Sequence, residues 1–382
     1  MFRLAIPVMA LLLSVGIGLP LSAQRQLPKT IEVPYPPGVE NLEGTTVPYR
    51  EAGTERQFRL AFTTKGQGDT RHGAMDYKMW YQVSTDGGKT YDTLRPLIQQ
   101  GEQYSRMHPI EPVYITKNSY VYSIQPASRA SNGEVMLPFW FWPLDESGQL
   151  AHINDKVYTF SAVGVLVGTW TADGSDMIWD LGETVHLRHE DQSTRGAMEP
   201  AVVELKKPGH FLMTMRASNE SKPELPSCKW KCLSTDYCRT WSEPVPITYS
   251  DGTPFYSPSS WSDIRRHGKN GKLYWFGNIS ETNPKGNMPR FPLVVAEMDE
   301  ESLGLIRESV QIIDTKTPEK GDTDLVQFSN FRVVEDPDSG SFIITLRRLD
   351  AGRLKKGETT RTQTWPAERY EVPIPLQGAA QQ

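Results

Sequence analysis

Two copies of one octapeptide constrain the fold of this chain more than any other feature. Residues 84–91 read STDGGKTY and residues 234–241 read STDYCRTW; both fit the pattern S-x-D-x-G-x-T-W, with Tyr91 in the aromatic place of the first and Cys238 in place of Gly in the second. In such a turn Asp accepts backbone N–H bonds, Gly takes a positive φ and the final aromatic residue packs between sheets. A partial third copy occupies residues 171–175. Each good copy follows an apolar run, so the repeats indicate a chain of repeated antiparallel strand units.

The rest of the sequence shows the same alternation of short apolar runs and turn residues, without helical spacing. We expect strand units over residues 58–97, 108–185, 199–247, 257–313 and 328–348. Residues 41–50 and 370–375 are left over, and their pairing would form a further unit that closes a ring and removes exposed edges. The prediction is an all-β fold, a six-bladed β-propeller. A two-sheet sandwich is the alternative, but it does not explain the octapeptides.

The N-terminal residues 1–23 read as an export signal. Arg3 precedes an apolar run over residues 4–19, and Ala23 ends a small-residue cleavage site. The run is short for a membrane span and ends at Pro20. We therefore expect a secreted or periplasmic protein without membrane insertion, with a single domain over residues 24–382 and an extended lead-in at 24–43.

The charge and the cysteine content argue against nucleic acid as a partner and against a zinc site. A net charge of -5 argues against nucleic acid, which favours a basic stripe. The three cysteines, Cys228, Cys232 and Cys238, lack a fourth metal ligand nearby, so a local disulfide or buried thiols are favoured over zinc. We expect no metal and no organic cofactor, and the sequence indicates no oligomeric state.

The segments that carry chemistry lie in the second half of the chain. Residues 199–205 read EPAVVEL and are followed by FLMTMR at 211–216, and residues 290–296 read RFPLVVA. Together with the octapeptides, these segments resemble the sialidase superfamily, whose propellers carry Asp-box (BNR) repeats. The resemblance implies that Glu199 is a catalytic carboxylate. It also implies that Arg216 and Arg290 belong to a group of arginines that grips the carboxylate of a sugar.

These residue types suit that chemistry. Arg stays charged and presents a planar fork that matches a carboxylate, which Lys does not. A carboxylate beside the anomeric carbon can act as a base or stabilise an oxocarbenium-like transition state.

Two elements of the family pattern have no unique match. The first family arginine has only imperfect counterparts, Arg50, Arg59 and Arg106. The family's acid/base Asp falls between the first strand pair and the first octapeptide, an interval that contains Asp69, Arg71 and Asp76. We take Asp76 as a catalytic candidate, and Arg71 and Arg106 as substrate-binding candidates.

The nucleophile position is the largest departure from the family. Residues 328–333 read FSNFRV and resemble a Y-S-x-L segment, which places Phe328 where the family has a nucleophilic Tyr. Phe has no hydroxyl and cannot form a covalent glycosyl intermediate. Tyr256 and Tyr274 are the neighbouring tyrosines that could compensate.

A further cluster begins the second strand unit. Arg106, His108 and Glu111 lie in a segment that is expected to face the propeller axis. His108 could act as a general acid or base near neutral pH, and Glu111 could bind substrate. The alternative is that His108 shapes a turn and Glu111 pairs with an arginine.

The sequence thus predicts a secreted sialidase-like glycoside hydrolase that acts exo on a terminal acidic sugar of a glycan. One alternative is a propeller polysaccharide lyase that removes a proton alpha to a uronate carboxylate, with His108 as the base. The other alternative is a non-catalytic glycan-binding propeller, which the missing Tyr favours and the retained Glu199 disfavours.

Overall fold

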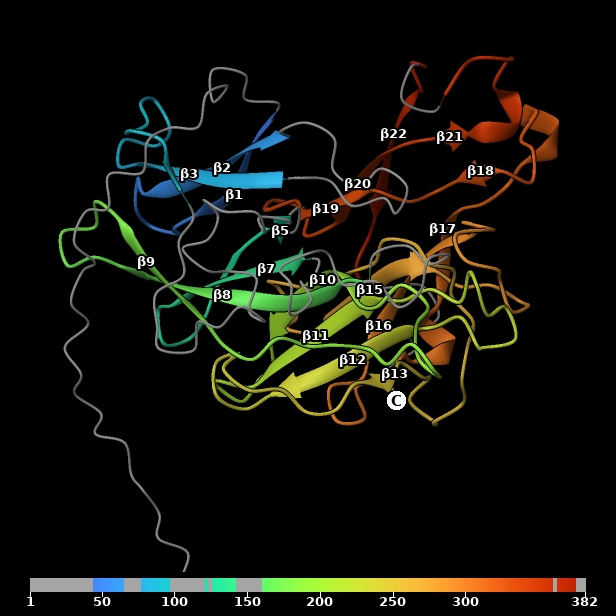
Figure 1. The fold of residues 1–382 in the computed structure, drawn as a ribbon, viewed down its shortest axis with the longest axis horizontal. Helices are drawn as coiled ribbons and strands as arrows, with labels where there is room; N and C mark the ends of the chain where they lie inside the picture. Colours follow the sequence, from blue (N-terminus) through green and yellow to red (C-terminus); the bar gives the residue numbers. More distant parts are fainter. Residues whose placement is uncertain are drawn as a thin grey trace, which may run out of the picture. The chain divides into compact units, whose positions relative to one another are not determined.

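The chain folds into short antiparallel strands joined by turns (Figure 1). The structure, a computed structural model, describes residues 44–64, 77–96, 121–122, 126–141, 160–359 and 363–375, which all belong to one unit, Val33–Gln382. Single-turn 3₁₀ helices interrupt the strands at η2 (Arg307–Ser309), η3 (Pro318–Lys320) and η4 (Ala351–Arg353). Within these ranges no helix is long and apolar enough to cross a membrane.

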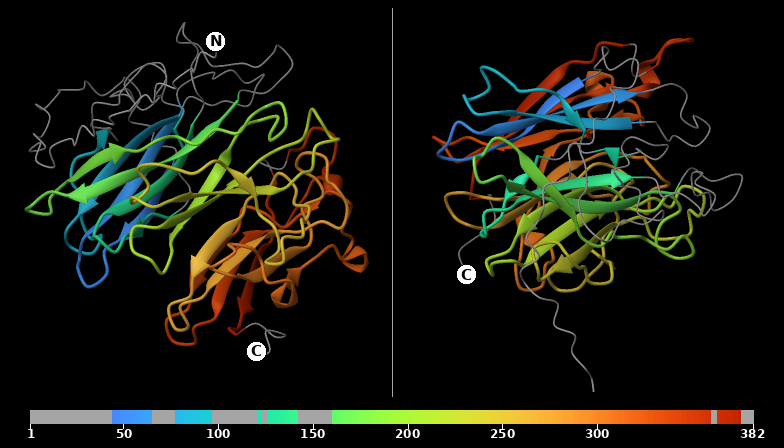
Figure 2. Two further views of the ribbon diagram at one scale, coloured as in Figure 1. Left: turned by 90° about the horizontal axis from the view of Figure 1, so that it is seen from below. Right: turned by 60° about the vertical axis from the view of Figure 1, so that its left-hand side comes forward.

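The strands form five successive sheets, called blades 1 to 5 here, which follow one another along the colour sequence of Figure 2. Blade 1 consists of β1 (Gly44–Arg50), β2 (Gln57–Thr64), β3 (Tyr77–Ser84) and β4 (Arg95–Pro96). Blade 2 consists of β5 (Val121–Tyr122), β6 (Ser128–Arg129), β7 (Val135–Phe141), β8 (Ala162–Trp170) and β9 (Met177–Leu181). Blade 3 consists of β10 (Met198–Glu204), β11 (Phe211–Arg216), β12 (Lys229–Ser234) and β13 (Val245–Pro246).

The last two sheets complete the described fold. Blade 4 consists of β14 (Asp263–Arg266), β15 (Leu273–Asn278), β16 (Leu293–Met298) and β17 (Gln311–Asp314). Blade 5 consists of β19 (Arg332–Glu335), β20 (Phe342–Arg347) and β22 (Ala367–Val372). A separate two-stranded pair, β18 (Val326–Gln327) with β21 (Leu349–Asp350), flanks blade 5.

The all-β propeller prediction is confirmed, but the prediction of six blades is wrong. The first leftover strand, β1, pairs with β2, with Tyr49 opposite Phe58. The last, β22, pairs with β20, with Tyr370 opposite Ile344. These two strands complete blades 1 and 5, so neither is left to form a sixth blade.

Apolar clusters between consecutive blades form the core. Phe58 of blade 1 meets Trp179 of blade 2 edge-on, with ring centroids 5.4 Å apart. Phe276 of blade 4 meets Phe342 of blade 5 at 5.1 Å. Two further clusters join blade 2 to blade 3 and blade 3 to blade 4. This packing of each sheet on the next is the arrangement of a propeller.

Strand sequences show which faces are covered. β8 is an almost continuous apolar run whose first seven residues are buried, because neighbouring blades cover both of its faces. On β20, Ile344 and Leu346 are buried while Thr345 and Arg347 are exposed. Side chains alternate between faces along a strand, so blade 5 has one apolar face and one solvent-exposed face.

The two octapeptides form the same turn. Asp86 accepts hydrogen bonds from Thr90 N at 2.9 Å and from Thr90 Oγ1 at 2.6 Å. Asp236 accepts from Thr240 N and Oγ1 at the same distances. These bonds outweigh burial and lower the pKa of the Asp236 carboxyl. Both aspartates therefore have structural roles.

All three cysteines are buried free thiols, so the local disulfide alternative is wrong. Cys238 has φ 65, the left-handed conformation that Gly88 adopts with φ 85 in the first octapeptide. Burial raises the pKa of the Cys228 thiol to about 12, which leaves it protonated and unreactive near neutral pH.

Candidate functional site

Glu199 stands at a strained position at the start of β10. The pairing of β10 with β11 shifts register between Met198 and Ala201, and Glu199 has φ 46. For a residue other than glycine this conformation costs roughly 1–3 kcal/mol, and such strain is concentrated at functional sites. Glu199 Oε1 accepts a hydrogen bond from Arg216 Nη1 at 2.6 Å. Its other oxygen, Oε2, is buried and accepts no hydrogen bond from the described residues.

Arg216 ends β11 and is held on three sides. Besides the ion pair with Glu199, its Nε donates to Ser259 Oγ at 2.8 Å and its Nη2 donates to Asn287 Oδ1 at 2.9 Å. The guanidinium plane is therefore fixed by contacts from three different segments of the chain. Fixed geometry of this kind is what recognition of a planar anion requires.

Arg290 lies beside Arg216 but has no comparable counter-charge. Its Nη2 donates to Ser259 O at 3.1 Å and its Nη1 to Gln327 Oε1 at 2.8 Å, while Nε has no acceptor within the described ranges. Ser259 thus touches both guanidinium groups, one through its hydroxyl and the other through its carbonyl. Burial first, and then the charge of Arg216, lower the pKa of Arg290 to about 10, against the attraction of Glu199. We call Arg216 and Arg290 the arginine clamp.

Lys229, the first residue of β12, is fully buried near the clamp, close enough for the charges of Arg216 and Arg290 to act on it. Its Nζ donates to Pro258 O at 2.7 Å and also to Ser260 O. These two carbonyls flank Ser259, so Lys229 fixes the residue that both clamp arginines contact. Burial, and next the charge of Arg216, hold the pKa of Lys229 well below its usual value.

Charge does not balance in this cluster. Two buried guanidinium groups and the buried amino group of Lys229 stand against one carboxylate, that of Glu199, and the described residues give Arg290 no ion pair. Buried charges are stable when they are paired. An anion placed between the arginines would supply the missing partner, so the site is suited to a ligand with a carboxylate.

The structure brings together three of the eight site residues predicted from sequence, Glu199, Arg216 and Arg290. The other five lie outside the described residues: Arg71, Asp76, Arg106, His108 and Glu111. The export signal at 1–23 and the lead-in at 24–43 also lie outside them.

Phe328 does not face the clamp. Its backbone N–H donates to Arg290 O at 3.0 Å, but its side chain is fully buried in the core between blades 4 and 5. The guanidinium of Arg348 covers its ring at 4.6 Å from the centroid. The neighbouring Gln327 is the residue of this segment whose side chain reaches Arg290. A tyrosine at position 328 would therefore place its hydroxyl in the core.

The two tyrosines considered as substitutes differ in their surroundings. Tyr274 is fully buried, and its hydroxyl accepts a hydrogen bond from Asn270 at 3.0 Å. Tyr256 is 39% exposed and lies three residues before Ser259. Tyr274 therefore belongs to the core, and Tyr256 stays near the clamp segment in sequence.

Sequence reasoning missed the residues that position the clamp, Ser259, Asn287, Gln327 and Lys229. None of them belongs to a motif. Lys229 gave no signal either, because β12 reads KWKCLS and the alternation of its two lysines with apolar residues is typical of a half-exposed strand.

No family model and no curated protein matches the sequence. Solved structures to which the chain is similar include the sialidase NanB, with 13% identity, 78% of this chain and 36% of that chain covered, and a TM-score of 0.48. They also include the intramolecular trans-sialidase from Ruminococcus gnavus, which is 16% identical, with 78% of this chain and 50% of that chain covered and a TM-score of 0.45. The Trypanosoma rangeli sialidase is 14% identical, with 78% of this chain and 42% of that chain covered and a TM-score of 0.45. The chain spans half or less of the length of these three structures.

Proposed function

We propose that this protein is a secreted sialidase-like glycoside hydrolase, which acts exo on a terminal acidic sugar of a glycan. The observation that carries the proposal is the clamp. Its two adjacent buried arginines both contact Ser259, and only one of them, Arg216, is paired with a carboxylate, that of Glu199. The resemblance of the 199–216 and 290–296 segments to sialidase motifs supports the same substrate class. Export rests on the signal-like residues 1–23.

The clamp would bind the sugar through its carboxylate. Arg216 presents a guanidinium already fixed by three contacts, and Arg290 adds a second with a buried Nε donor that is unused by the described residues. Charge-assisted hydrogen bonds from guanidinium to carboxylate are about twice as strong as neutral ones. A bound carboxylate would also relieve the repulsion between the two arginines, which gives an acidic sugar an advantage over a neutral one.

Glu199 would act on the glycosidic bond. Arg216 holds one of its carboxylate oxygens and leaves Oε2 free among the described residues. Oε2 could accept a proton from water as that water attacks the anomeric carbon, while an acid protonates the leaving oxygen. Asp76 is the proposed acid. Because Phe328 cannot act as a nucleophile, we propose inversion through an activated water, which needs the two carboxyl groups about 6.5–9.5 Å apart.

The test is mass spectrometry of the purified protein with a panel of sialylated and uronate-ended oligosaccharides. Hydrolysis should add one water across the bond and release the terminal acidic sugar. Glu199→Gln should keep binding and lose turnover by roughly 10²–10⁴-fold, whereas Arg290→Met should lose binding of the terminal acidic sugar at the clamp. Arg188→Met is the matched control, because Arg188 is exposed and its guanidinium pairs with Asp191 rather than with a clamp residue. If Arg290→Met hydrolyses acidic sugars as well as wild type does, the clamp is not the site.

A non-catalytic glycan-binding propeller is the second candidate. The observation that favours it is that no tyrosine hydroxyl contacts Glu199, Arg216 or Arg290 within the described residues. Saturable binding without any product, unchanged in Glu199→Gln, would support this candidate. A product with an unsaturated uronate would instead point to a lyase and to His108.

A further inference from the structure

A groove of about 570 Å³ opens on blade 5. Its lining includes Ser329, Asn330, Arg332, Arg347, Gln363 and Trp365. The volume falls within the range of roughly 300–1,000 Å³ that is typical of small-molecule sites. Ser329, Asn330 and Arg332 lie in the 328–333 segment of the sequence analysis, but no role was predicted for any of the lining residues.

The groove and the clamp share neighbouring residues of the chain. Gln327, which holds Arg290, precedes the groove residue Ser329 by two positions, so their Cα atoms are at most about 7 Å apart. Ser329 Oγ also accepts a hydrogen bond from Trp261 N at 3.3 Å, two residues beyond Ser259 of the clamp. The same two segments therefore border both sites.

The groove lies at the end of blade 5 that adjoins the clamp. β19 starts at Arg332, directly after the segment that contains Gln327 and Ser329, and β20 runs antiparallel and ends at Arg347. The start of β19 and the end of β20 are thus at the same edge. A glycan bound at the clamp could extend over this edge without crossing the blade.

The groove is cationic. Thr345 of β20 is opposite Arg332 on one neighbouring strand and Arg369 on the other, and Arg347 follows on the same face. All three arginines are exposed. Diagonal neighbours on one sheet face lie about 7–8 Å apart, which places Arg332 and Arg347 within reach of one ligand. Within the described ranges neither Arg332 nor Arg347 forms an ion pair, so their charges are not neutralised by the fold.

The remaining lining suits a sugar. Asn330 and Gln363 carry amides that can donate to and accept from hydroxyl groups. Trp365 adds an aromatic ring to the same wall, and aromatic rings combine a broad apolar face with a polar edge. Amides, an aromatic ring and two unneutralised guanidinium groups together match a sugar that carries a negative group.

We propose that the blade 5 groove binds a second anionic sugar of the same glycan, next to the terminal acidic sugar held by the clamp. The negative group is a carboxylate or a sulfate, since guanidinium groups bind both. The idea that the two sugars belong to one glycan rests on the proposed function. Binding of an anionic sugar by the groove does not depend on it.

The test uses the full-length protein with Arg290→Met, in which the clamp is disabled. Isothermal titration with a sulfated disaccharide and with an unsulfated uronate disaccharide should give saturable binding to the groove. Adding Arg332→Gln and Arg347→Gln should weaken this binding by about tenfold or more. Arg188→Gln in the same background is the control and should leave it unchanged. Binding of only one disaccharide identifies the anion as sulfate or carboxylate.

Two results would overturn the proposal. One is that Arg290→Met binds neither disaccharide, and the other is that the groove substitutions leave binding unaltered. Both results are independent of whether wild type cleaves any glycan, so they are distinguishable from failure of the proposed hydrolase. Because Arg332 and Arg347 are exposed, their replacement should leave the denaturation midpoint unchanged, which separates lost binding from lost folding.

Discussion

Replacement of Arg290 by Met separates a functional role of this arginine from a structural one. Arg290 is 9% exposed and charged, and its described partners are an amide oxygen and a backbone carbonyl rather than a carboxylate. An arginine that serves the fold should destabilise the protein when it is lost. Loss of an arginine that serves to bind a ligand should not destabilise the protein, because burying its charge without a carboxylate partner already lowers the stability of the fold.

The magnitude follows from the lowered pKa. A shift of the Arg290 pKa from 12.5 to about 10 corresponds to a cost of about 3 kcal/mol for keeping the folded group charged. The two hydrogen bonds to Gln327 and Ser259 offset roughly 1–2 kcal/mol of that cost. Arg290→Met should therefore leave the free energy of unfolding at pH 7 unchanged or raise it by about 1–2 kcal/mol.

The pH dependence gives an independent check. The folded pKa of Arg290 lies below its unfolded value, so the unfolded chain binds more protons between about pH 10 and pH 12.5. Wild-type stability should gain from this group as pH rises through that window, and Arg290→Met should lack the gain. Urea denaturation across the accessible alkaline range measures both effects.

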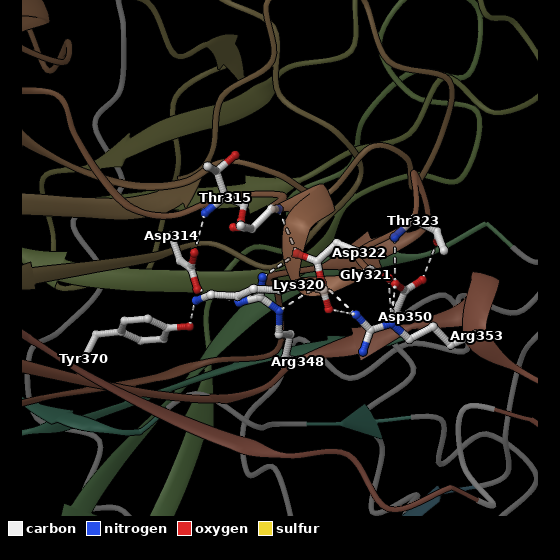
Figure 3. Close-up of polar contacts among 11 residues, drawn as sticks. Asp314, Thr315, Lys320, Gly321, Asp322, Thr323, Arg348, Asp350, Arg353 and Tyr370 are labelled. Carbon is white, nitrogen blue, oxygen red and sulfur yellow. Dashed lines mark hydrogen bonds and ion pairs between the residues drawn. The ribbon is translucent and has the colours of Figure 1, made fainter.

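Arg348→Met is the matched comparison, because Arg348 is also 9% exposed. Figure 3 shows Arg348 between Asp314 and Asp322, and it donates to Asp314 Oδ2 at 2.8 Å and to both oxygens of Asp322. Removing one partner of a buried ion pair costs about 3–5 kcal/mol, so Arg348→Met should be strongly destabilised. If Arg290→Met loses stability to the same extent, the reasoning about the clamp is refuted and Arg290 is structural.

Three further substitutions test the roles assigned to Lys229, Phe328 and Asp236. Lys229→Met should raise the KM, or the Kd of a bound glycan, more than it lowers turnover, because it releases the segment that holds Ser259; an unchanged KM would contradict this. The lowered pKa of Lys229 also makes wild-type stability rise as pH rises toward 10.5, a slope that denaturation of the variant should lack. Phe328→Tyr should lower the free energy of unfolding by about 1–3 kcal/mol, since its hydroxyl would be buried in the core, and a gain in glycosidase activity would show instead that position 328 faces the site. Asp236→Asn should destabilise by about 1–2 kcal/mol in urea through weaker bonds to Thr240 without changing activity at saturating substrate; a selective loss of activity would mean that this turn is not purely structural.

Local patterns in the sequence predicted an all-β chain of repeated strand units, although blades 1 and 5 each contain a strand that was left outside its predicted unit. The octapeptides at 84–91 and 234–241 form the expected turns, because a turn of that length is closed by bonds between its own residues. The apolar runs form strands for a similar reason. The alternation of apolar and polar residues and the content of β-branched residues favour a strand within a single segment. Glu199 and Arg216, which the motifs assign to one site, are in contact because they belong to one pair of adjacent strands.

Only the tertiary structure decided what depends on contacts between distant segments. The apolar pattern of β1 does not specify its partner, so the blade count required the pairing of β1 with β2 and of β22 with β20. Ser259 became part of the site through a contact with Arg216, 43 positions away in sequence. Gln327 rather than Phe328 faces Arg290 because successive side chains of an extended segment point in opposite directions, and the core between blades 4 and 5 took the aromatic ring. A motif can give the residue types of a site, but packing determines which side chains reach it.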